Sequence, residues 1–343
     1  MPWSADPAVL VAVLALVSLI TYGVLGGADY GGGVWDLFAT GPRKEDQRTA
    51  IAEAMGPVWE ANHVWLIFVI VLLFTSFPIA FQALSIALYV PFHLVLLGIT
   101  LRGAAFVFRA YAPRQGAVGR TRMERRWGAI FGVSSLLTPP LLGMSLGAVS
   151  SGALRLGGDP AAGAIGRAAS TAWLTPLPLA IGALALALCA YLAAVYLTNE
   201  TSGELREDFR RRSLAAGTAV VGVSVLLLPL LRFRAEHLWL GLTGRALPVL
   251  LIGAAAALAS GWTLFRRRYR LARICAIAQV ALLLLGWGIA QFPYLIYPDL
   301  TVSAAAAPEP IQRFVLLTAA PGLAILLPSL WFLFRVFKAE QRL

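Results

Sequence analysis

The sequence predicts an all-α integral membrane protein, a bundle of about nine transmembrane helices forming one domain over residues 1–343. Three observations support this fold class. The chain is 59% hydrophobic and only 13% charged, whereas a soluble domain carries about 25% charged residues. Apolar runs close to the ~20 residues that a bilayer core requires recur along the whole chain. Lys and Arg concentrate in alternate connections, as they do in helical membrane proteins.

The nine predicted spans are separated by short polar connections that leave no room for a soluble domain. The first follows Asp6 without a basic segment and is about 20 residues long, so we interpret it as a retained helix and not as a cleaved signal. The second is expected to begin before its apolar part, near Asp46, because the polar stretch 46–63 contains helix formers and only Pro57 as a breaker. The predicted spans are 7–27, 64–82, 85–108, 128–150, 173–197, 213–231, 246–265, 271–291 and 312–336.

The basic residues predict the orientation of the bundle. Of the 28 Lys and Arg residues, 22 lie at or after the ends of the odd-numbered spans, and the other six lie on the opposite side. Cytoplasmic connections carry the excess of Lys and Arg in membrane proteins. We therefore expect the N-terminus outside and the C-terminus in the cytoplasm, as an odd number of spans requires.

The rest of the composition excludes several classes of site. The formal net charge of +11 does not indicate nucleic-acid binding, because the basic residues form short clusters between apolar runs; the run 266–270 is explained by topology and lipid headgroups. Cys189 and Cys275 lie inside apolar runs, without metal-ligand spacing, so they are expected to be small buried hydrophobes. The cluster 31–33 follows no strand and is not a dinucleotide motif; its glycines instead favour close helix packing.

The stretch 56–65 places a carboxylate, an amide, an imidazole and two indoles at the start of an apolar run. Glu60 is the candidate catalytic residue, since an ionisable group inside a membrane helix is costly and marks a functional site by default. The predicted orientation puts it in the inner half of the membrane. Trp59, Asn62 and His63 surround it on the helix and are expected to have structural roles.

A proton relay is the functional interpretation of Glu60. Glu53 would lie two turns below it on the same helix face, about 10 Å away, and is the candidate for the first group of the relay. Pro57 would leave the carbonyl of Glu53 without its helical partner, able to hold a water. The alternative is an acid at a helix end that reaches water or pairs with an arginine, and the residues alone do not separate the two interpretations.

Asp29 and Arg102 are predicted to pair. Asp29 and Asp36 follow the first apolar run, and Arg102 lies at the inner end of the third. An aspartate and an arginine at similar depth on neighbouring helices are each costly alone in hydrocarbon. Their expected role is in assembly, with a direct part in proton access as the minority alternative.

The three histidines do not suggest haem ligation. His93 lies within the third apolar run and is either a haem ligand or a hydrogen-bonded core histidine; His237 is expected to be solvated in an outward loop. No two histidines show the facing arrangement of a haem-binding helix bundle. We therefore expect this chain to bind no haem and no metal.

Four stretches of the sequence carry a family resemblance. In residues 26–34, 57–66, 101–109 and 291–300, and in length, span count and motif order, the chain resembles subunit II of cytochrome bd quinol oxidases, including the cyanide-insensitive type. The resemblance implies a partner, subunit I, that carries the haems, of b and d type, and the quinol loop. It also implies a prokaryotic plasma-membrane complex, in contact with membrane lipids, that oxidises quinol and reduces O2 to water electrogenically.

The resemblance extends to individual residues. An acid at the position matching Glu60 lines a proposed cytoplasmic proton channel in the family; some members have Asp there, and some have Gln at the position matching His63. Some members hold a structural quinone in this subunit, and the sequence does not decide whether this chain does. Small single-span accessory subunits are also compatible with the resemblance.

Two other functions fit the composition. A proton- or ion-coupled secondary transporter would show paired, broken spans with polar clusters at the midplane, whereas here the charges gather near the first three spans. An assembly subunit without proton chemistry shares the fold and differs only in whether Glu60 moves protons.

Overall fold

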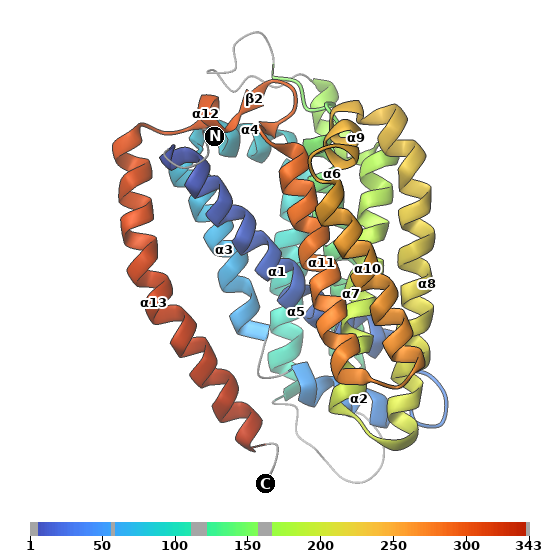
Figure 1. The fold of residues 1–343 in the computed structure, drawn as a ribbon. Helices are drawn as coiled ribbons and strands as arrows, with labels where there is room; N and C mark the ends of the chain where they lie inside the picture. The colour runs from blue at the N-terminus through green and yellow to red at the C-terminus, as the bar shows by residue number, and fades with distance from the viewer. Residues whose placement is uncertain (1–5, 56–58, 111–121, 157–166, 341–343) are drawn as a thin grey trace.

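The computed structural model describes residues 6–55, 59–110, 122–156 and 167–340 (Figure 1). Its helices are α1 (Pro7–Leu37), α2 (Lys44–Met55), α3 (Trp59–Ser76), α4 (Pro78–Ala87), α5 (Tyr89–Ala110), α6 (Arg122–Ser150), the 3-10 helix η2 (Arg167–Leu174), α7 (Pro176–Glu200), α8 (Gly203–Arg234), α9 (Glu236–Thr243), α10 (Leu247–Phe265), α11 (Tyr269–Gln291), α12 (Val302–Ala305) and α13 (Glu309–Glu340). The strands β1 (Tyr294–Ile296) and β2 (Leu300–Thr301) form a small antiparallel hairpin.

The predicted all-α membrane bundle is confirmed. Within the described residues, eight helices are long and apolar enough to cross a membrane, or nine if the bent pair α3–α4 counts as one span. The short hairpin in the connection 292–311 was not predicted. Its few residues do not change the fold class.

The predicted span 64–82 is wrong as a continuous helix. α3 ends at Ser76, and α4 leaves it at an angle of 118°. Pro78 occupies the first turn of α4, and a proline disfavours helical backbone in the residue before it, here Phe77. The Ser76 carbonyl then accepts N–H bonds from Ala307 (2.8 Å) and the Gln312 side chain (2.6 Å). Because α4 takes residues 78–87, the next span begins at Tyr89 and not at 85.

The first helix is longer than predicted. α1 continues ten residues beyond the expected end at 27 and includes Asp29, Asp36 and the glycines 31–33. A Cβ on Gly31 would collide with the backbone of Cys189 in α7, and one on Gly33 with the side chain of Ser135 in α6. The glycines therefore let α1 approach two neighbours closely, as expected for small residues in membrane bundles.

The largest core cluster lies among α7, α8, α10 and α11, around Tyr191 and Leu192. The hydroxyl of Tyr191 donates to Ser260 Oγ at 2.6 Å, so α7 and α10 share a polar contact inside this core. α1 packs against α3, α6, α7 and α11. α13 runs along the edge of the bundle, apart from α7 to α11 (Figure 1).

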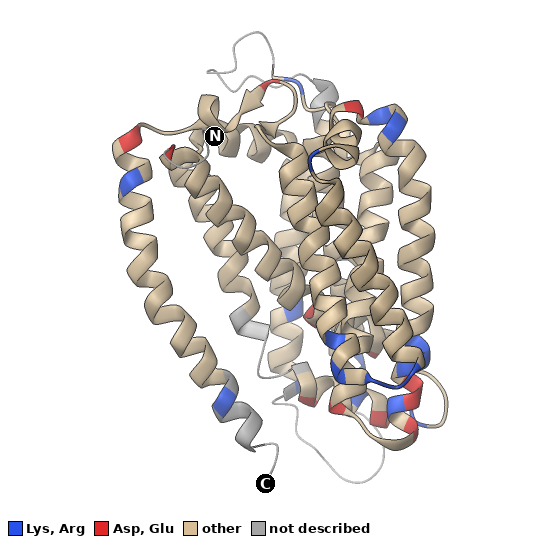
Figure 2. Cartoon of the chain, in the orientation of Figure 1, with Lys and Arg blue, Asp and Glu red and all other residues tan. Residues whose placement is uncertain are grey.

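Charged residues gather at one end of the bundle, near α2, the first turns of α8 and the α10–α11 connection (Figure 2). We call this the charged end. α4, α9, α12 and the hairpin lie at the opposite end, together with the N-terminus, and the chain ends toward the charged end (Figure 1). This arrangement agrees with an odd number of spans, while the assignment of the charged end to the cytoplasm stays a prediction.

Candidate functional site

Asp29 and Arg102 form a buried bidentate ion pair between α1 and α5. Arg102 Nη1 and Nη2 donate to the two carboxylate oxygens of Asp29 at 2.7 and 2.6 Å. Nη2 also donates to the Asp29 carbonyl at 3.0 Å, and Nε donates to Ser135 Oγ at 2.9 Å. The side chain of Arg102 is 2% exposed and that of Asp29 is 1% exposed. The predicted pairing is therefore present, and its fully bonded geometry offsets the desolvation of two charges.

A second pair, Asp36 and Arg109, lies two helical turns closer to the charged end. Arg109 Nη1 and Nη2 donate to the Asp36 carboxylate, both at 3.1 Å. Phe131 of α6 lies between the arginines, with its ring centre 4.8 Å from the Arg102 guanidinium and 5.2 Å from that of Arg109. Sequence reasoning missed this pair, although the seven-residue spacing of both aspartates and both arginines could have indicated it.

Aromatic and polar side chains from α1 and α3 surround the inner ion pair. The hydroxyls of Tyr22 and Tyr30 are 3.2 Å apart, and the ring of His63 is centred 6.4 Å from each tyrosine ring. Asn62 is 0% exposed, and among the described residues neither its amide N nor its O has a hydrogen-bond partner, nor has the indole N of Trp65. Buried amides are normally hydrogen-bonded, often to internal water, so the Asn62 amide is a candidate partner for internal water.

The first turn of α3 contains Trp59 and Glu60, but their side chains lie outside the described residues. Pro57 and the junction 56–58 also lie outside them, so the spacing expected between Glu53 and Glu60 on one helix is not described. Glu53 itself is exposed on α2. It lines a 560 Å³ cavity at the charged end, with the carboxylates of Asp46 and Glu200.

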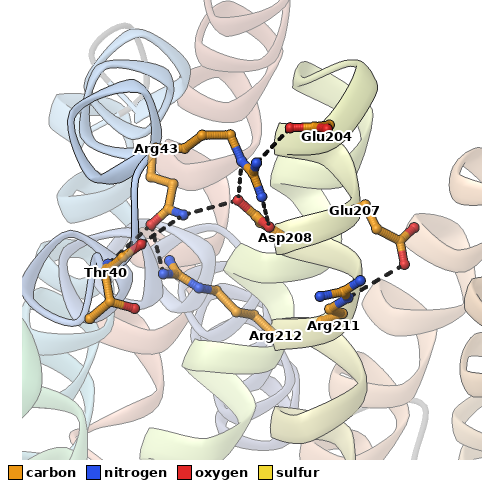
Figure 3. Close-up of polar contacts among 8 residues, drawn as sticks. Thr40, Arg43, Glu204, Glu207, Asp208, Arg211 and Arg212 are labelled. Carbon is orange, nitrogen blue, oxygen red and sulfur yellow. Dashed lines mark hydrogen bonds and ion pairs between the residues drawn. The ribbon is translucent and has the colours of Figure 1, made fainter.

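A separate network ties the α1–α2 connection to α8 at the charged end (Figure 3). Arg43 donates to both carboxylate oxygens of Asp208, from Nε at 2.8 Å and Nη2 at 2.7 Å, and to Glu204 at 2.6 Å. Its hydrogen bonds to Asp208 raise the pKa of Arg43 above its usual value. Gln47 accepts from Arg212 at 2.7 Å and donates to Asp208 at 3.1 Å. These contacts join distant segments and were not predicted.

The histidine predictions need two corrections. His93 is exposed on α5 and is not a core residue; its Nδ1 donates to the Tyr89 carbonyl at 2.7 Å. His237 lies on the short helix α9 and not in a loop, with its ring stacked on Tyr297 at 4.4 Å and edge-on to Tyr294. Burial lowers the pKa of His237.

The described residues contain no group of three or more His, Cys, Asp or Glu side chains placed to hold a metal ion. The three histidines lie on three different helices, α3, α5 and α9. That the chain binds no haem stays a prediction.

The comparisons with known proteins agree with one another. The family model described as cytochrome bd terminal oxidase subunit II matches residues 7–337. A putative cytochrome bd menaquinol oxidase subunit II of Bacillus subtilis is 24% identical, with 94% of this chain and 92% of that protein covered. Cytochrome bd-I ubiquinol oxidase subunit 2 of Escherichia coli is 27% identical, over 61% and 52% of the two chains. A chain of the bd oxidase of Geobacillus thermodenitrificans has a similar fold, with a TM-score of 0.80 at 23% identity, covering 97% of this chain and 99% of that one.

Proposed function

This chain belongs to the cytochrome bd terminal oxidase subunit II family, and we propose that it carries protons from the charged end of the bundle toward the oxygen-reducing site of its partner subunit. As subunit II it is a multi-pass membrane component of a bacterial respiratory quinol oxidase and implies a subunit I. Family membership removes the secondary transporter as an alternative. When bound in the complex, the haems supply electron transfer and oxygen chemistry.

The observation that carries the proposal is the polar lining of α3 where it faces α1. Asn62, His63 and Trp65 occupy the first two turns of α3. His63 and Trp65 lie near Tyr22 and Tyr30 of α1. Asn62 is fully buried, and no described residue bonds its polar side-chain atoms. A proton path needs a titratable group and positions where hydroxyls and waters can pass a proton along, and Glu60 would be the titratable group one turn before His63.

Protons would enter at the charged end, where Glu53 lines the acidic cavity beside α2. Their exit would follow α3, because this helix also presents exposed apolar side chains. Ile67 and Phe74 are 58% and 62% exposed there, and Leu96 on α5 is 61% exposed. Exposed apolar side chains on a membrane subunit face lipid or another subunit. We assign the α3–α5 side to subunit I.

Asp29 and Arg102 are proposed to serve assembly and not proton transfer. The carboxylate of Asp29 accepts two arginine N–H bonds, and both partners are almost completely buried. A carboxylate whose two oxygens both accept arginine N–H bonds is fixed in place and is poorly placed to pass protons along. The pair therefore forms a fixed wall of the polar region beside α3.

The proposal is tested by replacing Glu60. Glu60→Gln keeps the size and hydrogen bonding of the side chain but cannot carry a proton. We expect the complex to assemble with its haems and to reduce O2 about 10²-fold more slowly, as is typical when a proton-transfer group is removed, whereas Glu60→Asp should retain much of the activity. A parallel route in the partner subunit would make the loss smaller.

The matched control is Glu53→Gln, which removes an exposed acid from α2. It should slow turnover less than Glu60→Gln, because other acids line the same cavity. Haem spectra and native gels verify assembly in each case. Wild-type turnover by assembled Glu60→Gln across pH 6 to 8 would leave Glu60 a structural residue.

The direction of proton uptake depends on the predicted orientation. Cys189 and Cys275 are first replaced by Ala. Ser202→Cys at the charged end and Glu236→Cys at the opposite end are then introduced separately, and intact cells are treated with a membrane-impermeant thiol reagent to measure the labelling of each cysteine. We expect labelling at 236 only. Labelling at 202 only would invert the bundle and contradict cytoplasmic proton uptake through Glu60.

A further inference from the structure

The α10–α11 connection has an unusual arginine in its turn. Arg267 has φ 59°, the left-handed region, where a glycine is normally found at the end of a helix. The turn is closed by hydrogen bonds from the Arg268 N–H to the Thr263 carbonyl at 2.7 Å and from the Arg267 N–H to the Leu264 carbonyl at 3.1 Å. A side chain in this conformation carries an energetic cost. The presence of an arginine here therefore suggests that its side chain makes an interaction that offsets this cost.

A cavity of 410 Å³ lies beside this turn, and four of its lining residues are arginines: Arg206, Arg267, Arg268 and Arg270. No carboxylate of the described residues lines it. Arg206 is fixed at the cavity, since its Nε donates to the Thr201 carbonyl at 2.6 Å and its guanidinium lies over the Tyr269 ring at 5.2 Å. Four arginines around one concave space predict an anionic ligand.

Carboxylates near the cavity only partly balance these charges. Glu207 lies 3.7 Å from Arg267 but is held more closely by Arg210, at 2.7 Å. Glu200 lines the neighbouring cavity, which also includes Arg206, and lies 3.7 Å from Arg273. Neither acid makes a close ion pair with an arginine of the turn. The positive charge at the cavity therefore remains available to a ligand.

The surroundings of the cavity are those of a membrane surface. α11 begins at Tyr269 with no side-chain cap, so the unpaired N–H groups of its first turn also favour an anion. Leu271 lines the cavity and is 46% exposed, and Trp262 and Phe265 on α10 are 59% and 67% exposed. Basic side chains thus meet exposed apolar side chains where two candidate membrane spans join.

We propose that this cavity binds the phosphate group of an anionic membrane phospholipid, with its acyl chains along the apolar side chains of α10 and α11. Arginine suits a phosphate because its planar N–H groups bond two oxygens at once. Basic pockets between membrane helices at the cytoplasmic side have this use. The exposed Leu271 and Phe265 favour a lipid over free phosphate, which has no apolar part. The inference is independent of the proton route.

The test uses the assembled complex, delipidated in mild detergent and titrated with phosphatidylglycerol, with native mass spectrometry to count bound lipid. The variant Arg268→Gln with Arg270→Gln should weaken phosphatidylglycerol binding about 30-fold, from the roughly fivefold that each interfacial arginine contributes. Arg211→Gln is the matched control, because Arg211 is a 75% exposed arginine at the same end that does not line the cavity. It should leave binding unchanged.

Arg267→Gly separates binding from folding. Glycine is the preferred residue at this turn position, so the variant should keep the thermal midpoint and haem spectrum of the complex and still lose lipid affinity. Equal losses in Arg211→Gln and the double variant would reduce the effect to general surface charge and overturn the proposal. Displacement of phosphatidylglycerol by millimolar inorganic phosphate would instead identify a free-anion site, and phosphatidylcholine binding equally well would exclude phosphate-charge recognition.

Discussion

Two arginine–carboxylate pairs in this chain have nearly the same geometry in different surroundings. Arg102 holds Asp29 through bonds of 2.6 and 2.7 Å inside the bundle, and Arg43 holds Asp208 through bonds of 2.7 and 2.8 Å at the charged end. The inner side chains are 2% and 1% exposed, whereas the outer ones are 33% and 16% exposed.

The difference shows that the same contact has two consequences. At the charged end water can solvate either partner when the other is lost, so an exposed pair contributes little. Inside the bundle bulk water does not reach the remaining partner, so its charge is left poorly compensated. The inner pair therefore acts as a condition for folding α1 against α5, and the outer pair acts as one of many contacts that orient α8.

The largest effect is expected from breaking the inner pair. Asp29→Ala leaves Arg102 buried and unpaired, which should destabilise the subunit by about 3–5 kcal/mol and lower the amount of assembled complex more than the turnover per remaining haem. Immunoblots and haem content of membranes measure this. Replacing both partners, Asp29→Leu with Arg102→Met, should restore much of the assembly, since no charge is stranded. Normal complex levels with lost activity in Asp29→Ala would argue for a catalytic role.

A smaller effect is expected at the second pair. Arg109 is 16% exposed and Asp36 is 3% exposed, so loss of Arg109 leaves an acceptor that is buried but close to the charged end. Arg109→Ala should cost about 1–3 kcal/mol, the range for a buried polar group left unsatisfied. Thermal denaturation of the detergent-solubilised complex tests whether Arg109→Ala is less destabilising than Asp29→Ala. If Arg109→Ala destabilised the complex as much as Asp29→Ala, the contribution of an ion pair to stability would not depend on its depth in the bundle.

The outer pair should respond to salt more than to mutation. Arg43→Ala should lower the free energy of unfolding by less than about a quarter of the loss expected for Asp29→Ala, because exposed ion pairs contribute little to stability. The wild-type protein should lose part of this small contribution as salt rises, since salt screens exposed charges. Thermal midpoints of both proteins at low and high salt measure it. Failure of Arg43→Ala to assemble would show that the network of Figure 3 is as essential as the inner pair.

The smallest effect is expected from pH at His237, outside both pairs. Burial lowers the pKa of His237, against a smaller opposite effect of its hydrogen bond to the Gln291 backbone. Because the folded pKa lies below the unfolded value of about 6.5, the stabilisation is complete above pH 6.5 and is lost as the pH falls through the folded pKa. The midpoint of thermal unfolding should therefore fall more between pH 7 and 5.5 in the wild type than in His237→Gln. Identical pH profiles would contradict this.

Several features could be predicted from the sequence because they depend on local composition. The apolar runs predict the membrane spans, and the positions of Asp29 and Arg102 in neighbouring spans predict their pairing, since each is costly alone in hydrocarbon. The break at Phe77 was missed because an apolar run hides a turn; Pro78 was the available signal. His93 was misplaced because an apolar stretch in a membrane span does not show which helix face points inward.

By itself, the sequence determined that this chain is a bundle of membrane helices, because transfer from water to hydrocarbon depends on each residue and its neighbours along the chain. For the same reason it predicts that Glu60 and Asp29 are costly charges in the bundle. Only the tertiary structure decided that Arg109 pairs with Asp36, that Arg43 reaches Asp208 across 165 positions of the chain, and that arginines of α8 and the α10–α11 turn share one cavity. These contacts depend on how helices distant in sequence are rotated and placed against one another, and that information lies in the packing of the whole bundle.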